Sequence, residues 1–364
     1  MNMSRNSKIS SMNRDEKYMS LAVNLAKRGL GRVSPNPAVG CIIVKGNRII
    51  AKGYHKQYGA DHAEIEALKR ADGRAKDATM YITLEPCTHY GKTPPCIDAI
   101  IKSKIRRVVI ATEDPNPLVC GKGIKKLNIK GIKTKVGVCA AKAAKINETY
   151  FKHIKANRPF VILKIAQSLD GKIATSSGDS KWISSEKSRN FVHGLRSRTD
   201  AVMVGIGTVL KDDPLLSIRT PHLPGRQAGI VYRTSYSQPV KIIVDSRLRI
   251  SPKANIFSKE SPAKVIIATT DSASNKKIRL IKNKGAQVLI VKSKQSKVNL
   301  KLLMKSLAQT GIASILVEGG GELSASLLKE GLADKIMFFI SPKIIGGKDA
   351  KTSVEGKGVE KVID

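Results

Sequence analysis

The residues whose types and spacing could perform chemistry are concentrated in the first half of the chain. His62 and Glu64 are two residues apart, and Cys87 and Cys96 follow them. One imidazole and two thiolates form a three-ligand zinc set that leaves a fourth position for water. Bound zinc lowers the pKa of that water towards neutrality and makes a hydroxide nucleophile available. Glu64 is close enough to exchange a proton with this water without binding the metal.

The spacing of these residues resembles a known motif and departs from it in one respect. An H-x-E triplet followed by P-C-x-x-C is typical of zinc-dependent deaminases. Here Cys96 follows Cys87 by nine residues rather than three, and the insert contains His89. Each residue alone would more often be structural, but the combination favours a metal site. We expect His89 to contact substrate or to support the ligands, because three ligands already complete a catalytic site.

Length and composition fit a globular chain with two or three domains. The chain has 364 residues, of which 41% are hydrophobic, and no apolar run is long enough to span a membrane. Residues 1–12 are polar and predict a disordered tail rather than a secretory signal. Five cysteines do not form a disulfide framework, so we expect reduced thiols, a cytoplasmic location and no membrane partner.

The net charge of +36 invites a nucleic-acid interpretation, which the distribution of charge does not favour. Of the 65 basic residues 46 are Lys, whereas bidentate recognition and stacking favour Arg. Residues 1–150 contain 28 basic and 12 acidic residues, and the remainder contains 37 and 17. The excess is therefore spread along the chain, and we expect compositional drift and no specific nucleic-acid partner.

Alternating apolar and amphipathic runs predict an α/β chain. In the first half we expect helices at 13–29, 61–70, 97–104 and 142–155, and strands at 39–44, 49–54, 80–84 and 107–111. Asn157-Arg158-Pro159 indicates a domain boundary. In the second half we expect strands at 160–165, 201–204, 241–244, 264–268, 287–291, 314–317 and 335–340, and helices at 186–198, 274–284, 300–310 and 322–330.

Four segments carry a resemblance to a known family. SPNPAVG (34–40), HAE (62–64), the long cysteine insert (87–96) and DPNP (114–117) together resemble the bifunctional deaminase/reductase family of riboflavin biosynthesis. The resemblance covers residues 13 to 360 in the family's order. It implies an N-terminal cytidine-deaminase-like α/β/α sandwich at 13–150 and a C-terminal dihydrofolate-reductase-like α/β domain at 158–364.

The resemblance also assigns roles in the first domain. His62, Cys87 and Cys96 would hold one zinc ion per chain, and Glu64 would be the catalytic proton shuttle. Asn36 and His55 would line the pyrimidine pocket. The expected partner is a phosphorylated pyrimidine metabolite, 2,5-diamino-6-(5-phosphoribosylamino)pyrimidin-4-one, which is deaminated and then reduced from ribosyl to ribityl with NADPH.

The second half is less decisive when its residues are considered alone. Residues 317–321 (VEGGG) form a Gly-rich turn between an apolar strand and a helix pattern, where a helix N-terminus attracts phosphate. A tight structural turn is an equally good interpretation, and the turn lacks the G-x-G-x-x-G fingerprint, which argues against a Rossmann fold. Arg196 could bind a substrate phosphate or complement a helix dipole.

The resemblance resolves these alternatives position by position. It implies NADPH contacts at Ala166, Trp182, Thr208, Asp212, Ser246, Gly320, Gly321, Glu322, Leu323, Ser324, Ala325 and Ser326. It implies substrate contacts at Ser180, Arg196, Leu216, Arg219 and Glu318. Lys164 and Asp170 lie in the motif of the first strand and could polarise the ribose.

Two departures from the family and two alternative functions complete the prediction. Residues 221–236 are hard to align, so no role is assigned there. Family members continue with another strand after residues 356–364, so we expect an uncovered sheet edge in the reductase domain. We expect a homo-oligomer. The alternatives are a tRNA-type nucleic-acid deaminase and a deaminase with a degenerate reductase domain.

Overall fold

The computed structural model describes residues 12–91, 94–181, 183–218, 238–260 and 262–361. The chain divides into two compact units, Met1–Asn157 and Arg158–Asp364, which we call the first and the second unit. None of the helices in the described ranges is long and apolar enough to cross a membrane. The predicted tail falls, except for Met12, outside the described residues.

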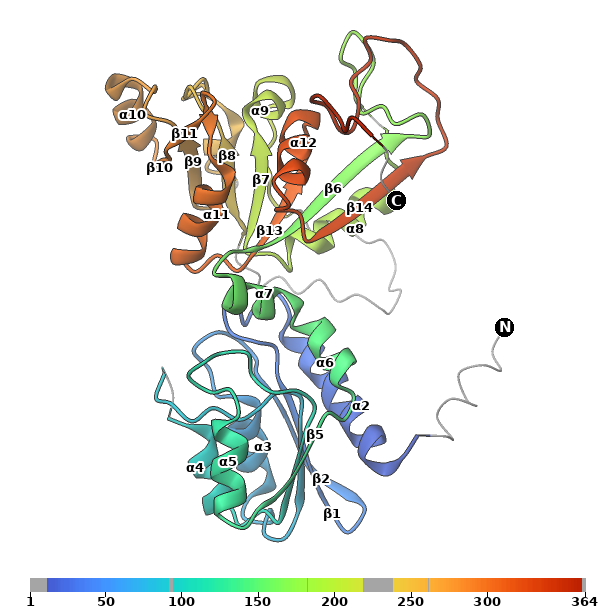
Figure 1. Cartoon of the computed structure of the whole chain (residues 1–364), viewed down its shortest axis with the longest axis vertical. Coiled ribbons are helices and arrows are strands. Elements are labelled where there is room, and N and C mark those ends of the chain that lie inside the picture. Colours follow the sequence, from blue (N-terminus) through green and yellow to red (C-terminus); the bar gives the residue numbers. More distant parts are fainter. Residues whose placement is uncertain (1–11, 92–93, 182, 219–237, 261, 362–364) are drawn as a thin grey trace. The chain divides into compact units, whose positions relative to one another are not determined.

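The first unit, coloured blue to green in Figure 1, is built on a five-stranded sheet with the order β2-β1-β3-β4-β5. Strand β1 is antiparallel to both of its neighbours, and β3, β4 and β5 are parallel to one another. The strands are β1 (Gly40–Lys45), β2 (Arg48–Tyr54), β3 (Thr79–Ile82), β4 (Arg107–Ile110) and β5 (Lys133–Val136).

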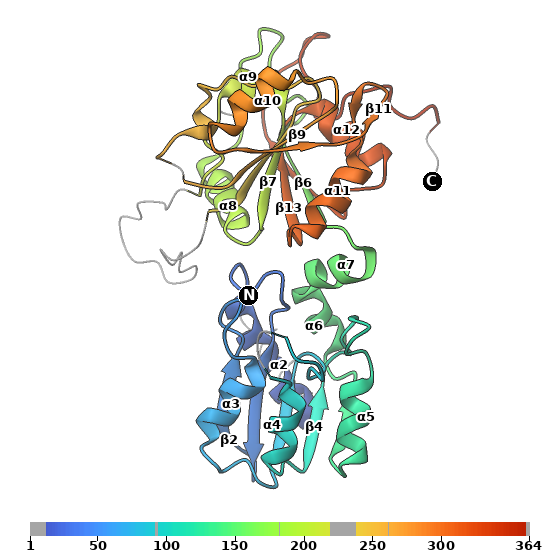
Figure 2. The same cartoon turned by 90° about the vertical axis from the view of Figure 1, so that its left-hand side faces the viewer.

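Helices cover both faces of this sheet because alternate strand residues are apolar on each side. The helices are α2 (Arg14–Ala26), η1 (Lys27–Gly29), α3 (Ala63–Ala71), α4 (Cys96–Lys102), α5 (Lys122–Ile129), α6 (Ala140–Ile146) and α7 (Glu148–Ala156). Helices α3, α4 and α5 pack on one face (Figure 2), and α2 and α6 pack on the other. The result is a three-layer α/β/α sandwich.

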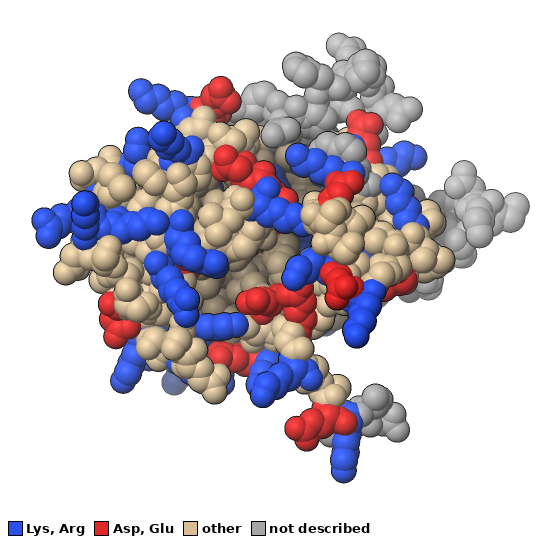
Figure 3. Space-filling view, turned by 90° about the horizontal axis from the view of Figure 1, so that it is seen from above, with Lys and Arg blue, Asp and Glu red and all other residues tan. Residues whose placement is uncertain are grey.

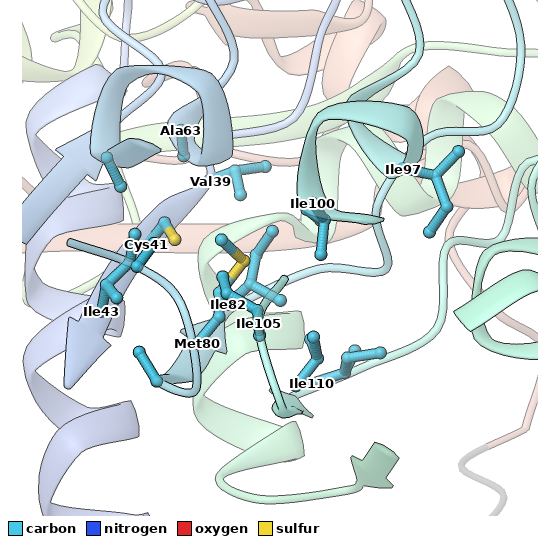
Figure 4. Close-up of a cluster of buried hydrophobic side chains, with 14 of the residues drawn as sticks. Val39, Cys41, Ile43, Ala63, Met80, Ile82, Ile97, Ile100, Ile105 and Ile110 are labelled. Atoms are coloured by element: carbon cyan, nitrogen blue, oxygen red, sulfur yellow. The ribbon is translucent and has the colours of Figure 1, made fainter. Parts of the chain in front are cut away.

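Two short-range features place the helices of the first unit. Asn13 and Glu16 form a reciprocal capping box that starts α2. On the other face Gly53 allows α3 to approach β2 closely, since a Cβ atom there would lie 2.3 Å from the Ala63 carbonyl oxygen. Ala63 and Ile97 are fully buried in the core beneath α3 and α4 (Figure 4).

The second unit contains a seven-stranded sheet with the order β10-β9-β8-β7-β13-β6-β14, in which every neighbouring pair is parallel. Its strands are β6 (Phe160–Ser168), β7 (Ala201–Gly205), β8 (Val240–Val244), β9 (Val265–Thr269), β10 (Gln287–Ile290), β13 (Ser314–Glu318) and β14 (Lys335–Ser341). A separate small hairpin joins β11 (Ser293–Lys294) to β12 (Lys297–Val298).

Both faces of this parallel sheet are covered. Helices α11 and α12 contribute to the core on one face, and α8, α9 and α10 contribute on the other. The helices are α8 (Glu186–Arg196), α9 (Ile206–Asp212), α10 (Asn275–Lys282), α11 (Leu300–Gln309) and α12 (Gly321–Lys329), with a short η2 at Asn255–Phe257. The predicted fold class is confirmed, a cytidine-deaminase-like sandwich followed by a dihydrofolate-reductase-like α/β unit.

Sequence reasoning missed several elements. It assigned no helix at α5, no strand at β5, no helix at α9 and no hairpin at β11 and β12. The helix predicted at 142–155 is two helices, α6 and α7, which meet at Asn147. The remaining predicted elements form within a few residues of their expected bounds.

Candidate active sites

The three predicted metal ligands come together in the first unit. The Nδ1 atom of His62 lies 3.2 Å from the Sγ atom of Cys96 and 3.6 Å from that of Cys87. One ligand atom from each residue lies within 4.8 Å of the others. Zn–N and Zn–S bonds of about 2.0–2.3 Å in a tetrahedron require donor separations of this size. The donor set and its spacing therefore fit zinc.

Each ligand is attached to an element held by the core. His62 is the N-cap residue of α3, and Cys96 is the first residue of α4. The residues that follow them, Ala63 and Ile97, are buried in the same hydrophobic cluster. Cys87 follows β3, and its Sγ atom accepts the backbone N–H of Cys96 at 3.3 Å. Hydrogen bonds from Cys96 and His62 lower the pKa of the Cys87 thiol, the direction that a thiolate ligand requires.

Glu64 lies in the first turn of α3 and is 3% exposed. Burial raises the pKa of its carboxyl to about 7, and the nearby His62 opposes this rise. A carboxyl group near neutral pKa can both accept and donate a proton at physiological pH. The structure places Glu64 next to the ligand set, and its catalytic role remains a prediction.

His55 and Asn36 are also brought to this site. The His55 ring lies edge-on to the His62 ring at a centroid distance of 5.3 Å. His55 Nδ1 is 3.0 Å from the Asp61 carbonyl oxygen, which only accepts, so Nδ1 carries the proton. Burial lowers the pKa of His55, which favours the neutral ring. The Nε2 atom of His55 can then accept a hydrogen bond from the Asn36 side-chain amide, whose nitrogen lies 3.5 Å away. This pair is consistent with the predicted wall of the pyrimidine pocket.

The other cysteines take no part in this cluster. Cys41 is fully buried in the core, and burial raises the pKa of its thiol. Cys120 and Cys139 are free thiols that lie outside the ligand set.

Sequence reasoning did not identify Glu85, a buried carboxylate just before Cys87, because its hydrogen-bond partners are backbone groups far along the chain.

In the second unit the predicted cofactor residues gather at the carboxyl edge of the parallel sheet. Thr208 follows β7, Ser246 follows β8, and Gly320 follows β13. Open α/β sheets bind ligands in the crevice outside this edge. Ser246 Oγ accepts the backbone N–H of Val298, which ties β8 to the β11–β12 hairpin.

The turn before α12 has the backbone geometry of an anion site. Gly319 and Gly320 have φ values of 81° and 84°, which favour glycine. Thr208 Oγ1 would lie 3.3 Å from a Cβ atom on Gly319, so any side chain there would crowd it. Gly320, the N-cap residue of α12, has no side chain that could bond to the first N–H groups of the helix, and such groups can meet the phosphates of NADPH. The turn fits a dinucleotide.

The predicted substrate residues Arg196 and Glu318 form a partly buried ion pair. Arg196 Nε and Nη2 donate to the two Glu318 oxygens at 2.5 and 3.0 Å, and Nη1 donates to the Ser217 carbonyl at 2.8 Å. Lys164 is the register partner of Glu318 on β6, and burial lowers the pKa of its amine. These three residues form one polar group at the carboxyl edge of the sheet.

The remaining predicted residues differ in their surroundings. Leu216 lies in a hydrophobic core with φ 51°, so contact with substrate would involve its backbone. Asp170 accepts the backbone N–H groups of Ile345 and Gly346 and the Ser168 hydroxyl, and these bonds lower its pKa to about 2. Ala166 is half-buried on β6, Ser180 is half-buried, and Asp212 is exposed at the end of α9. Trp182 and Arg219 lie outside the described residues.

The predicted cofactor residues of α12 differ in their contacts within the protein. The Ser324 and Ser326 hydroxyls donate to carbonyl oxygens within their own helix, and Leu323 is in the core. Glu322 is exposed and pairs with Lys297 at 3.4 Å. Ala325 and Gly321 lie against residues 352–356, which include Glu355, whose backbone N–H donates to the Gly321 carbonyl at 3.2 Å.

Comparisons with known proteins match a family to each of the two units. Residues 12–112 match the family described as the cytidine and deoxycytidylate deaminase zinc-binding region, and residues 159–363 match the RibD C-terminal domain. The riboflavin biosynthesis protein RibD of Aquifex aeolicus is 46% identical over 332 residues, which cover 91% of this chain and 88% of that protein. The Escherichia coli protein is 38% identical over 350 residues, which cover 96% and 93%.

Solved structures give the same result. Form 1 of Acinetobacter baumannii RibD superimposes with a TM-score of 0.84 at 38% identity and covers 95% of this chain and 91% of that one. A Thermotoga maritima deaminase/reductase superimposes with a TM-score of 0.79 at 37% identity and covers 96% and 94%. The chain therefore belongs to the RibD family, the bifunctional zinc-dependent deaminases and NADPH-dependent reductases of riboflavin biosynthesis.

Proposed function

We propose how the residues of this bifunctional enzyme divide its two reactions, hydrolytic deamination of 2,5-diamino-6-(5-phosphoribosylamino)pyrimidin-4-one and reduction of the ribosyl group to ribityl. Residues 13–150 of the first unit perform the deamination, and residues 158–364, the second unit, perform the reduction. The observation that carries the proposal is the convergence of His62, Cys87 and Cys96 beside the buried Glu64. A zinc ion bound there lowers the pKa of water towards neutrality.

Glu64 moves the protons of the deamination. Its carboxylate accepts a proton from the attacking water and delivers it to the leaving amine. Its burial and its position two residues after His62 support this role. His55 and Asn36 hold the pyrimidine through their polar atoms, and His55 remains neutral because it is buried and donates to Asp61.

The second unit binds the phosphorylated uracil product and NADPH at the carboxyl edge of its sheet. NADPH supplies the hydride for the ribose C1 position. Thr208, Ser246 and the turn beginning at Gly320 hold the cofactor. Arg196, Glu318 and Lys164 hold the sugar and its phosphate, and the bidentate pairing of Arg196 with Glu318 fixes the guanidinium before substrate arrives.

A coupled assay on the full chain tests this division. Purified enzyme is supplied with the pyrimidine nucleotide, and ammonia release and NADPH oxidation are recorded separately. We expect ammonia release without NADPH, and NADPH oxidation only after deamination. Ammonia release without NADPH oxidation would favour a degenerate reductase unit, and deamination of RNA but not of the nucleotide would favour a nucleic-acid deaminase.

We further propose a homo-oligomer that contacts through strand β14. Ile336, Phe338 and Ile340 alternate along this strand and are 45%, 51% and 58% exposed. In the described residues β14 pairs on one side only, with β6. Two copies could pack these apolar rows against each other and remove them from water. Light scattering of the Phe338→Lys protein should show a smaller species than the parent, and an unchanged mass would contradict this contact.

No specific nucleic acid is part of this proposal. On the face of the second unit seen in Figure 3, Lys and Arg side chains are interspersed with Asp and Glu. Such a surface attracts small anions weakly, and salt screens the attraction. We propose a cytoplasmic enzyme of phosphorylated metabolites, and RNA retention that survives 0.2 M salt, a concentration at which nonspecific phosphate contacts weaken strongly, would contradict it.

A further inference from the structure

The carboxylate of Glu85 gathers backbone donors from a distant segment of the first unit. Glu85 is 3% exposed and lies between the end of β3 and Cys87. Its two oxygens accept four backbone N–H groups at 2.9–3.3 Å, those of Asp114, Gly121, Gly123 and Ile124. All four belong to the connection after β4 or to the first turn of α5.

These bonds satisfy a helix start that has no cap of its own. Gly121 is the N-cap residue of α5, and no side chain at that position bonds to the helix. The N–H groups of the first turn of a helix need outside acceptors, and a negative charge there is favourable. Glu85, which precedes Gly121 by 36 residues, supplies both the hydrogen-bond acceptors and the negative charge.

The start of α5 also packs directly on the backbone next to Cys87. A Cβ atom on Gly123 would lie 2.5 Å from the Pro86 carbonyl oxygen and 3.2 Å from Glu85 Cγ. Pro86 is the residue before Cys87. Glycine at position 123 therefore permits the close approach that brings the donors to the carboxylate.

Cys87 is consequently fixed from two directions. Downstream, its carbonyl oxygen accepts the Ile97 N–H at 3.3 Å, and its Sγ atom accepts the Cys96 N–H. Upstream, the Glu85 N–H donates to the Thr112 carbonyl at 3.0 Å, and its carboxylate holds α5. The described residues between β3 and α4 form no helix or strand, so these bonds take the place of regular structure.

We infer that Glu85 is a positioning residue of the deaminase site, whose buried carboxylate joins the Cys87 segment to the β4–α5 connection and so fixes the Cys87 thiolate for metal binding. The inference rests on the proposed zinc site. An amide at this position would place an NH₂ group against backbone N–H donors, and the Cys87 segment would lose its upstream support.

The test uses the full chain with Glu85→Gln and measures three quantities. These are the rate of zinc transfer to a chromophoric chelator, kcat and KM for ammonia release, and the rate of NADPH oxidation with the deaminated product. We expect zinc release to rise and deamination kcat to fall by about 10- to 100-fold, the range seen when a partner of a metal ligand is removed. NADPH oxidation should stay unchanged.

Asp15→Asn is the matched control. Asp15 is another buried carboxylate of the first unit with several partners, but it binds Tyr81 and Arg107 on the α2 face of the sheet. This variant should lose thermal stability while its zinc release and kcat stay within about twofold of the parent. If Glu85→Gln behaves like this control, the role of Glu85 is only structural and the inference fails.

Gly123→Ala provides an independent variant that leaves the carboxylate in place. The added methyl group would push α5 away from Pro86, so zinc release should accelerate here too. If the Glu85→Gln protein does not fold, the Gly123→Ala protein is judged by the same criteria. A zinc-release rate equal to that of the parent protein would then overturn the inference. Zinc transfer is measured without substrate, so failure of the proposed reaction would be seen separately.

Discussion

The Nδ1 atom of His62 and the Sγ atom of Cys96 lie 3.2 Å apart, although 34 residues separate them in the chain. His62 caps α3 and Cys96 begins α4, and the residue that follows each of them is buried in the same hydrophobic core. Packing of α3 and α4 therefore brings these two ligands together, and the irregular segment before α4 supplies the third, Cys87.

The first prediction concerns loss of one ligand. Cys96→Ser should remove the bound zinc and reduce ammonia release by more than about 100-fold, because two ligands do not hold a catalytic zinc. Metal analysis of the purified protein checks it. NADPH oxidation with the deaminated product should be retained, and loss of both activities would indicate general misfolding instead.

A second prediction separates metal binding from proton transfer. Glu64→Gln keeps the side-chain shape but cannot accept a proton, so kcat for ammonia release should fall by about 10²- to 10⁴-fold. The zinc content should remain one per chain. Deamination at the parental rate would remove Glu64 from the mechanism.

The third prediction tests the turn before α12. Gly320→Ala should weaken NADPH binding by at least about tenfold, because φ 84° strains an alanine at the N-terminus that meets the phosphates. Fluorescence titration of NADPH measures it. Gly331→Ala is the control, since Gly331 has φ 63° but open space around it at the other end of α12. Equal effects in the two variants would locate the cofactor elsewhere.

A fourth prediction concerns acid stability. Arg107 and the other hydrogen-bond partners hold the pKa of Asp15 well below its usual range. A carboxyl with a lowered folded-state pKa stabilises above its unfolded pKa, near 4, and loses this contribution as the pH falls towards the folded value. Asp15→Asn should therefore cost about 3 kcal/mol at pH 7. The difference between the two unfolding free energies should shrink below pH 4 in denaturant titrations, and a constant difference would refute it.

The elements that sequence reasoning found and missed differ in how much apolar surface they bury. Val39–Val44 predicted β1 almost to the residue because all but its last residue are buried. Strand β5 at Lys133–Val136 is an edge strand without a buried residue, so it carries no alternating apolar pattern. Helix α5 has only 8 residues and buries only Gly123 and Leu127, so its pattern is too short to stand out.

The residues of the two candidate sites also differ in whether the sequence alone could predict them. The zinc ligands and Glu64 could be predicted because their residue types and order carry the chemistry. The Arg196–Glu318 pair joins residues 122 positions apart and could not be derived from spacing. Glu85 was missed because its four partners are backbone N–H groups, which any sequence would supply at those positions.

Arg158, the first residue of the second unit, donates to both oxygens of Asp334 at 2.7 and 2.8 Å. Asp334 also accepts the Val161 N–H, so the chain is attached to its own sheet as soon as it leaves Asn157, which ends α7 in a left-handed conformation. We therefore expect a chain that begins at Arg158 to keep this ion pair, and separate expression of the two units tests whether each one folds alone.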